Sequence, residues 1–171
     1  LNDRGAHGQG KKFLSIFIEM FSLKDFENSP NVDCEVVIDN KRRIDILIHD
    51  SKYAVAIENK IWAKDQTNQL TDYATFLDQK FSGEFKLFYL NPYGLNPNNQ
   101  SITTQGINKL ENKFDIISYE YHIIKFLKKC IGICEASQVS VFINEFIKFI
   151  EKKINLTNTI SMDTGIKELI L

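Results

Sequence analysis

The sequence contains few cysteines, and their spacing matches no common cysteine framework. Cys34, Cys130 and Cys134 make an odd number, with no Cys-x-x-Cys pair and no histidine at zinc-finger spacing. A disulfide scaffold or a structural zinc site requires paired or regularly spaced ligands. These two classes are therefore excluded, and a reducing cytoplasmic setting is the simpler expectation.

The sequence also lacks a long hydrophobic run. A transmembrane helix requires about 18 apolar residues in succession, and no such stretch is present. The N-terminal region does not have the pattern of a signal peptide either. We therefore expect no membrane partner. Because the sequence begins with Leu1 instead of methionine, we expect it to be a trimmed or incomplete version of a longer protein.

A strong charge of either sign is absent as well. The formal net charge is -1, which argues against a protein that coats nucleic acid indiscriminately. Basic clusters such as Lys41-Arg42-Arg43 and Lys152-Lys153 remain, and they are interpreted either as a local basic groove or as solvated surface. The length of 171 residues, with 43% hydrophobic and 25% charged residues, suits a single domain spanning residues 1–171.

The most informative pattern begins in the segment Arg43–Ile48. Ile44, Ile46 and Ile48 alternate with other residues, as expected for a strand with a side-chain period of two. Asp45 would then lie on the face opposite the three isoleucines. A carboxylate is thus expected on one side of a sheet whose other side is apolar.

A second strand is expected over residues 53–60, with Glu58 and Lys60 on the face opposite its larger apolar residues. The polar break His49–Lys52 is short enough to join the two strands as a hairpin. When the strands pair with their apolar faces together, Asp45 comes to lie on the same side of the sheet as Glu58 and Lys60. The sequence therefore predicts an acidic cluster with a neighbouring ammonium group.

Such a cluster has the composition of a magnesium site. Two neighbouring carboxylates repel each other, so they remain ionised at neutral pH only beside a cation or in solvent. Mg²⁺ prefers one or two carboxylates and leaves its other positions to water and phosphate. A lysine beside them could hold or activate a water molecule next to a phosphate. The pattern predicts metal-assisted hydrolysis of a phosphodiester bond.

These residues resemble the signature of the PD-(D/E)XK nuclease superfamily. The signature is an acidic residue, here Asp45, followed by Glu58-Asn59-Lys60 at the end of an apolar strand. The pair Gln69 and Tyr73 resembles the branch in which a Gln-x-x-x-Tyr helix follows the catalytic lysine. The Gly5–Gly10 segment is similar to the entry segment of a bacterial group in this superfamily. The resemblance covers about residues 1–127.

The resemblance implies roles for the residues of the cluster. Asp45, Glu58 and the backbone carbonyl of Asn59 would bind Mg²⁺ or Mn²⁺. Lys60 would orient the attacking water or help to deprotonate it. The implied enzyme is a magnesium-dependent deoxyribonuclease.

Gln69 and Tyr73 are four residues apart and would project from one face of a helix, where the resemblance implies that they support the site. The implied partner is nucleic acid, most readily DNA, in a bacterial setting such as phage defence, and a homodimer is compatible with the family. The alternative is a catalytically inactive nucleic-acid-binding or scaffolding protein that retains the fold. The mild net acidity and the lack of an assigned third acid favour that alternative.

Three further residues are candidates whose participation the sequence leaves open. Glu19 and Glu35 could each supply a third carboxylate, and His7 could contact phosphate. The resemblance also implies that a helix containing a glutamate would precede Leu1. Glu35 is expected on a strand beside the Asp45 strand, and its facing depends on a register that the sequence does not determine.

The expected fold is α/β, with a central mixed sheet of four to five strands flanked by helices, a restriction endonuclease-like αβββαβ core and a helical C-terminal part. Residues 155–171 are expected to form a flexible tail or part of a domain edge. The periodicity and the turn signals predict helices over 11–26, 65–80 (with Asp65 as N-cap), 121–134 and from 137 onward, and strands over 33–38, 42–48, 53–60, 85–90 and 114–118, with a turn at Asn40-Lys41.

Overall fold

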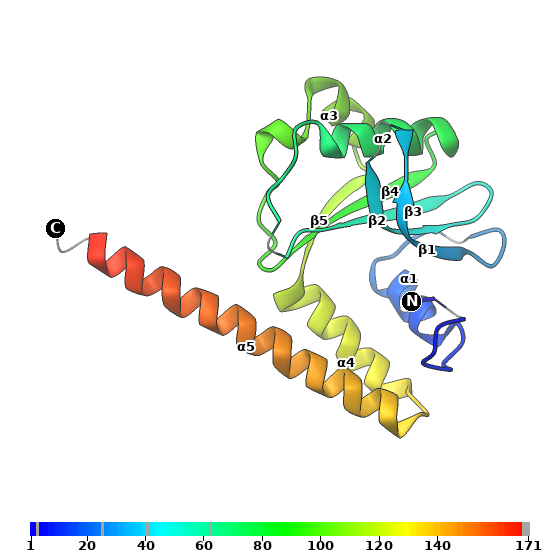
Figure 1. Ribbon diagram of the computed structural model, residues 1–171. Coiled ribbons are helices and arrows are strands. Elements are labelled where there is room, and N and C mark those ends of the chain that lie inside the picture. The colour runs from blue at the N-terminus through cyan, green and yellow to red at the C-terminus, as the bar shows by residue number, and fades with distance from the viewer. Residues whose placement is uncertain (3, 25, 40–41, 62, 169–171) are drawn as a thin grey trace.

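A computed structural model describes residues 1–2, 4–24, 26–39, 42–61 and 63–168, and it leaves the side chains of 105 and 155–168 undescribed. The chain forms a mixed sheet with helices on both faces (Figure 1), which confirms the expected fold class. Its main elements are α1 (Lys12–Met20), β1 (Asn31–Val37), β2 (Arg43–His49), β3 (Ala54–Asn59), α2 (Gln69–Lys80), β4 (Phe85–Asn91), α3 (Thr104–Leu110), β5 (Phe114–Ser118), the π-helical turn η3 (Tyr119–Ile123), α4 (Ile124–Ile133) and α5 (Ser137–Glu168).

The five strands lie in the order β1-β2-β3-β4-β5. The first three form the expected antiparallel meander, and α2 provides the crossover that makes β4 parallel to β3, with β5 parallel to β4. Ile46 pairs with Ile57 across β2 and β3. Continuing this register by one residue places Asp45 opposite Glu58.

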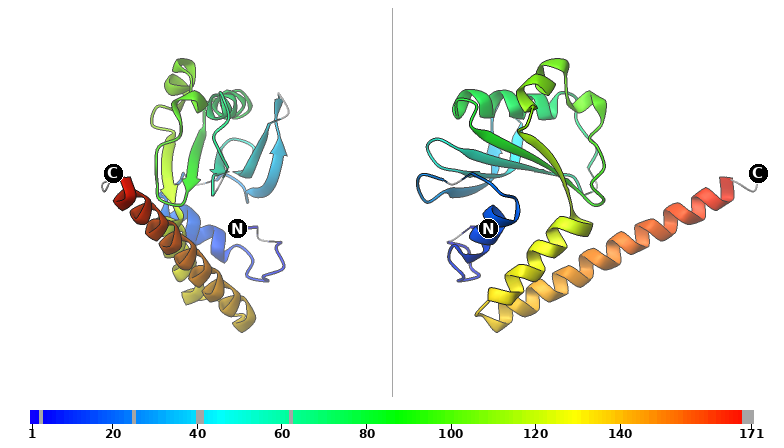
Figure 2. Two further views of the ribbon diagram at one scale, coloured as in Figure 1. Left: turned by 60° about the vertical axis from the view of Figure 1, so that its left-hand side comes forward. Right: turned by 180° about the vertical axis from the view of Figure 1, so that it is seen from behind.

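The sheet is covered on both faces, and each face has its own hydrophobic core. One core joins the sheet to α1, α4 and α5, and the other joins it to α2 and α3, as the two further views show (Figure 2). The central strand β3 is buried from Ala54 to Glu58, as expected for a strand between two helical layers. The small Ala54 and Ala56 face the α2 layer, so α2 can pack close to the acidic end of the strand.

Two predicted helix boundaries were wrong. The first helix ends at Met20 instead of residue 26, because Ser22 adopts a left-handed conformation with φ of 48° and the N–H of Leu23 bonds back to the carbonyl of Ile18. The second begins at Gln69, with Asn68 and not Asp65 at its N-cap position. The Asp65 carboxylate instead accepts hydrogen bonds from the Tyr89 hydroxyl and the Asn98 N–H.

The C-terminal part is helical, as predicted. The chain leaves β5 through the π-helical turn η3 and continues into α4, and α5 then extends through residues 155–168 of the segment for which a tail was expected. Helix α3 was not predicted. The expected turn at Asn40-Lys41 lies outside the described residues. Within the described ranges, no helix has both the length and the apolar character needed to cross a membrane.

Candidate active site

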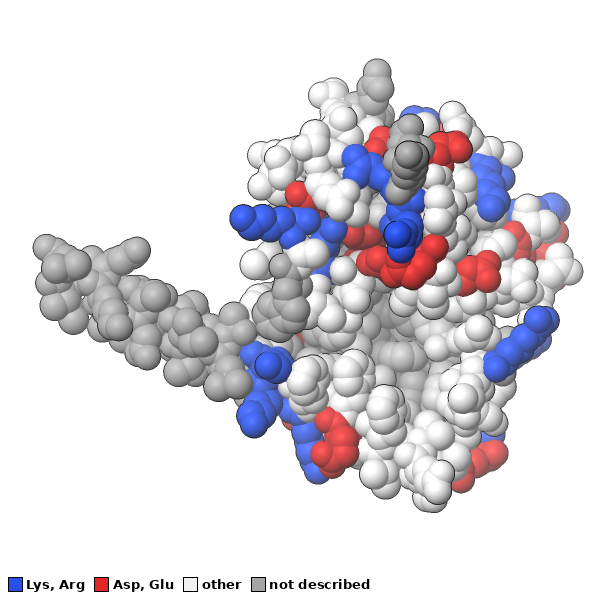
Figure 3. All heavy atoms as spheres, viewed as in Figure 1, with Lys and Arg blue, Asp and Glu red and all other residues white. Residues whose placement is uncertain are grey.

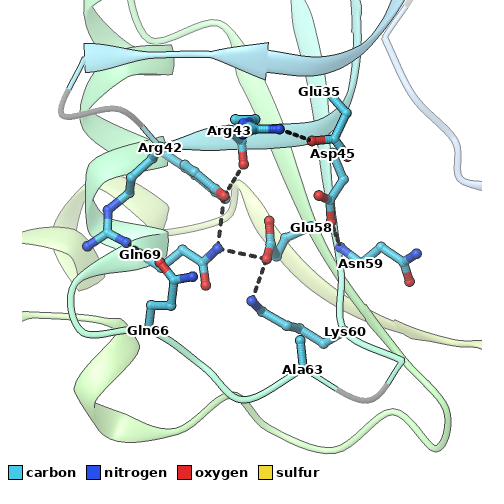
Figure 4. A pocket seen from close by; sticks show the side chains of 11 residues that line it. Glu35, Arg42, Arg43, Asp45, Glu58, Asn59, Lys60, Ala63, Gln66 and Gln69 are labelled. Carbon is cyan, nitrogen blue, oxygen red and sulfur yellow. Dashed lines mark hydrogen bonds and ion pairs between the residues drawn. The ribbon is translucent and has the colours of Figure 1, made fainter.

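A polar pocket of about 550 Å³ opens where β2 and β3 meet the N-terminal end of α2 (Figure 4). The five side chains predicted to form the site all line it, together with Asn59. The complete lining comprises Glu35, Arg42, Arg43, Asp45, Glu58, Asn59, Lys60, Ala63, Gln66, Gln69 and Tyr73.

Glu58 and Lys60 form a buried ion pair at the end of β3. They are two residues apart and so share a face of the strand, and the Lys60 Nζ lies 2.7 Å from Oε1 of Glu58, with exposed fractions of 6% and 3% for the two side chains. Burial raises the pKa of Glu58. The hydrogen bond from Lys60 opposes this shift, and the negative charge of Asp45 adds to it.

Asp45 is held at the neighbouring position by the backbone of β3. Its Oδ2 accepts a hydrogen bond of 2.6 Å from the N–H of Asn59. Partial burial raises the pKa of Asp45, and the hydrogen bond from the Asn59 N–H opposes this shift. The negative charge of Glu35 also raises the pKa of Asp45, whereas the positive charge of Lys60 lowers it. A site that binds a cation would reverse this effect, because a cation favours the ionised carboxylates.

Gln69 and Tyr73 support Glu58 from helix α2. The Gln69 side-chain amide donates to Oε1 of Glu58 at 2.8 Å, and it also lies 2.9 Å from the Tyr73 hydroxyl. The Tyr73 hydroxyl donates to the backbone carbonyl of Arg43. Tyr73 is fully buried, and this burial raises its pKa. Helix α2 is therefore joined to both active-site strands through these two side chains.

Two buried acceptor atoms in this cluster have no hydrogen-bond partner among the described residues: Oε2 of Glu58 and Oε1 of Gln69. Buried oxygen atoms of this kind normally have a partner, so each implies a further ligand or water molecule. Oε1 of Glu58 already receives Lys60 and Gln69, which leaves Oε2 available for another cation. Hard oxygen donors at this position fit a divalent metal ion such as Mg²⁺.

The acidic set in the pocket is small. Across the described part of the chain, no group of three or more histidine, cysteine, aspartate or glutamate side chains is arranged to hold one metal ion. Asp45 and Glu58 alone would leave most coordination positions to the protein backbone, water or substrate. That division suits Mg²⁺, which commonly retains several water molecules in protein sites.

Of the three open candidates, only Glu35 lines the pocket. Its neighbours Cys34 and Val36 pair with Ile46 and Ile44, the two neighbours of Asp45, and both acids line the pocket. Glu35 has φ of 54°, and its carboxylate lies 3.4 Å from Arg43. A left-handed residue interrupts the strand pleat.

The expectation that the three isoleucines of β2 share one face of the sheet was wrong. Ile44 does not share a face with Ile46 and Ile48, because it packs in the α2 core beside Leu47 while the other two isoleucines pack in the opposite core. The simple alternation of β2 is therefore broken next to Asp45.

Glu19 and His7 lie elsewhere. Glu19 is 79% exposed on α1, which covers the opposite face of the sheet, and its carboxylate lies 3.8 Å from Lys129. Both ring nitrogens of His7 are engaged within the N-terminal loop, with the carbonyl of Asn2 and the N–H of Gln9. The arrangement gives His7 a structural role in the loop.

Two residues near the site were not singled out from the sequence. Arg42 is mostly buried and pairs with Asp72, Gln66 and the carbonyl of Thr67, so it braces the loop before α2. The other residue is Tyr119, whose hydroxyl donates to the side-chain oxygen of Asn59 at 3.1 Å. No local sequence pattern identifies a contact between residues so far apart.

On the face shown in Figure 3, basic and acidic side chains are interspersed instead of forming one continuous basic surface.

A family model described as the PD-(D/E)XK nuclease superfamily matches residues 1–151. Comparisons with curated proteins and with solved structures give no significant match. The matched range contains all five strands and every residue that lines the pocket.

Proposed function

Since this chain belongs to the PD-(D/E)XK nuclease superfamily, we propose that it is a divalent-metal-dependent nuclease that hydrolyses phosphodiester bonds in DNA. The observation that carries the proposal is the difference between the two oxygen atoms of the Glu58 carboxylate. One oxygen is bound by Lys60 and Gln69, and the other is buried without a partner among the described residues, in the pocket that Asp45 also lines.

Asp45 and Glu58 would hold Mg²⁺ or Mn²⁺, with the backbone carbonyl of Asn59 as a further ligand. When bound, the cation would neutralise charge that develops on the phosphate and lower the pKa of a coordinated water molecule. Lys60 would orient the attacking water, and its positive charge would favour loss of the water's proton, from a position that its contact with Glu58 supports. Gln69 would keep the Glu58 carboxylate oriented, and Tyr73 would keep Gln69 in place.

With a cation bound by Asp45 and Glu58, the polar pocket would suit a phosphate-containing substrate better than an apolar one, because the cation would offset the repulsion between the carboxylates and the phosphate. The choice of DNA rests on the family resemblance, as does a role in bacterial defence against phage. The net charge of -1 suggests that contact with nucleic acid is local, around the pocket, and not spread over the whole surface.

A cleavage assay tests this function. Plasmid DNA is incubated with wild type, Lys60→Ala and Asp45→Asn in Mn²⁺ or Mg²⁺, with circular dichroism as the check on folding. Lys128→Ala is the matched control, because Lys128 is exposed on α4, which covers the opposite face of the sheet. Wild type and the control should nick or linearise the plasmid, and both site variants should lose activity by about 10²-fold or more. A folded wild type that binds DNA but cleaves none with either metal would favour the scaffolding alternative.

A further inference from the structure

Asn59 lies between Glu58 and Lys60, and it makes hydrogen bonds through both its backbone and its side chain. Asn59 is the last residue of β3, and its backbone connects Glu58 to Lys60. Its N–H donates to Asp45, and its side-chain oxygen accepts the hydrogen bond from Tyr119. The orientation of this one residue therefore affects Asp45 directly and, through the backbone, Glu58 and Lys60.

Tyr119 is well placed to fix that orientation, because the backbone around it is itself held. It opens η3, a π-helical turn, and such turns are rare and frequently occur at functional sites. The preceding residue, Ser118, pairs with Asn91 of β4, and its N–H donates to the Nδ1 of His122. The N–H of Glu120 donates to the carbonyl of Pro92.

The Tyr119 ring is half-buried and packs against the core that α1, α4 and α5 share with the sheet. It also lines an apolar cavity of about 260 Å³ together with Ile61 and Phe149. The Tyr119 hydroxyl thus reaches the end of β3 from a ring that the core holds in place. A hydroxyl presented in this way can restrict a partner side chain with little motion of its own.

We propose that Tyr119 is a positioning residue of the metal site, which acts through Asn59 to hold Asp45, Glu58 and Lys60 in the arrangement that binds a divalent cation. This inference rests on the function proposed above, but it concerns a contact outside the superfamily signature. Tyr119 lies on the turn that connects the last strand to the C-terminal helices. The C-terminal part of the chain would therefore contribute to the site that the central strands form.

The expected effect of losing this contact is on metal affinity. Residues that orient metal ligands through hydrogen bonds typically change affinity or activity by about 10- to 100-fold when they are replaced. Tyr119→Phe removes the hydroxyl and keeps the ring that packs in the core. Asn59→Ala removes the acceptor and keeps the backbone N–H that binds Asp45. If the two groups act through each other, their effects should not multiply.

A double-mutant cycle read by calorimetry with Mn²⁺ alone tests the proposal. Tyr119→Phe and Asn59→Ala should each weaken Mn²⁺ binding by about tenfold, and the double variant should be no weaker than either single variant. Thermal unfolding of the metal-free protein should change little. The matched control is Tyr121→Phe, which removes the hydroxyl of an exposed tyrosine in the same turn and should leave Mn²⁺ affinity unchanged.

The outcomes separate this inference from the proposed function. Wild type that binds Mn²⁺ but cuts no DNA contradicts the nuclease assignment and leaves the cycle readable. Wild type that cuts DNA while Tyr119→Phe binds Mn²⁺ within about twofold of wild type overturns the positioning role alone, since that role requires about a tenfold change. Effects that multiply in the double variant also overturn it, and a wild type that binds no Mn²⁺ overturns both proposals.

Discussion

Lys60 and Glu58 form an ion pair that is almost completely buried, with Nζ 2.7 Å from Oε1. Two charges removed from water in this way are costly, and their mutual attraction seldom stabilises a fold more than apolar packing would. The pair is better explained by chemistry than by stability. It keeps an ammonium group beside a carboxylate whose second oxygen has no partner among the described residues.

Removal of Lys60 should affect stability as well as catalysis. Lys60→Met leaves the buried Glu58 carboxylate without its cation, which typically costs about 3–5 kcal/mol. The double variant Glu58→Gln/Lys60→Met removes both charges, so its loss in the free energy of unfolding should be smaller than that of Lys60→Met alone. Urea unfolding of the metal-free proteins measures this. A double variant less stable than Lys60→Met would contradict this expectation, because it would mean that the unpaired Glu58 carboxylate does not cause the loss.

Binding of a divalent cation should stabilise the folded protein. At a free Mn²⁺ concentration of about 100 times Kd, the expected gain is about 2.7 kcal/mol, or roughly 5–10 °C in Tm for a domain of this size. Scanning calorimetry measures the shift, which a chelator should reverse. Asp45→Asn should abolish most of it, whereas an equal shift in that variant would place the ion elsewhere.

The affinity for the cation should depend on pH. Burial raises the pKa of Glu58 and of Asp45, so both carboxyls begin to take up protons above their ordinary range, and a metal ion must displace those protons. Because the folded protein binds these two protons more tightly than the unfolded chain, protonation stabilises the metal-free fold at pH values below the ordinary carboxyl pKa. This stabilisation is lost as the pH rises through the raised pKa values. The Mn²⁺-induced rise in Tm should therefore grow from mildly acidic to neutral pH.

Glu35→Gln provides the check on that pH dependence. The negative charge of Glu35 raises the pKa of Asp45, so the variant should move the midpoint of Mn²⁺ binding to lower pH. Calorimetric titrations in buffers with different ionisation enthalpies would also report the protons released. An unchanged midpoint would mean that Glu35 does not influence the site.

The hairpin that aligns the two active-site strands should depend on Asp50. Its buried carboxylate accepts hydrogen bonds from the N–H groups of Lys52, Tyr53 and Asn28. Burial acts to raise the pKa of Asp50, but these donors outweigh it and lower the pKa. Its contribution is therefore present above the ordinary aspartate pKa and is lost as the pH falls through the lowered value.

Asp50→Ala should reduce the free energy of unfolding at neutral pH by about 1.5–3 kcal/mol, measured by urea unfolding. Ser51→Ala, an exposed change in the same turn, is the control and should have little effect. Equal stabilities of the two variants at neutral pH would show that the carboxylate does not hold the hairpin.

Much of the sheet and of the pocket was predictable because it depends on short-range rules. Side-chain alternation and a four-residue turn are enough to bring Glu58 and Lys60 to the same side as Asp45, and helical spacing is enough to align Gln69 with Tyr73. The parallel placement of β4 follows from the length and helical pattern of the connection.

The features that were missed depend on tertiary contacts. Ile44 changes core next to the left-handed Glu35, which no alternation rule anticipates. Aspartate is a common N-cap residue, but the Asp65 carboxylate accepts hydrogen bonds from Tyr89 and Asn98 instead of capping α2. Tyr119 reaches Asn59 only because β5 runs parallel to β4, which in turn runs parallel to β3. Sequence spacing carries no signal for such contacts.

The most direct test is a crystal structure of wild type with Mn²⁺, in which anomalous scattering locates the ion. The expected result is one ion in contact with Oε2 of Glu58 and the Asp45 carboxylate, at distances close to the Mg–O value of about 2.1 Å, while Lys60 remains beside Oε1 of Glu58. An ion bound elsewhere, or a pocket that holds none at saturating Mn²⁺, would contradict it.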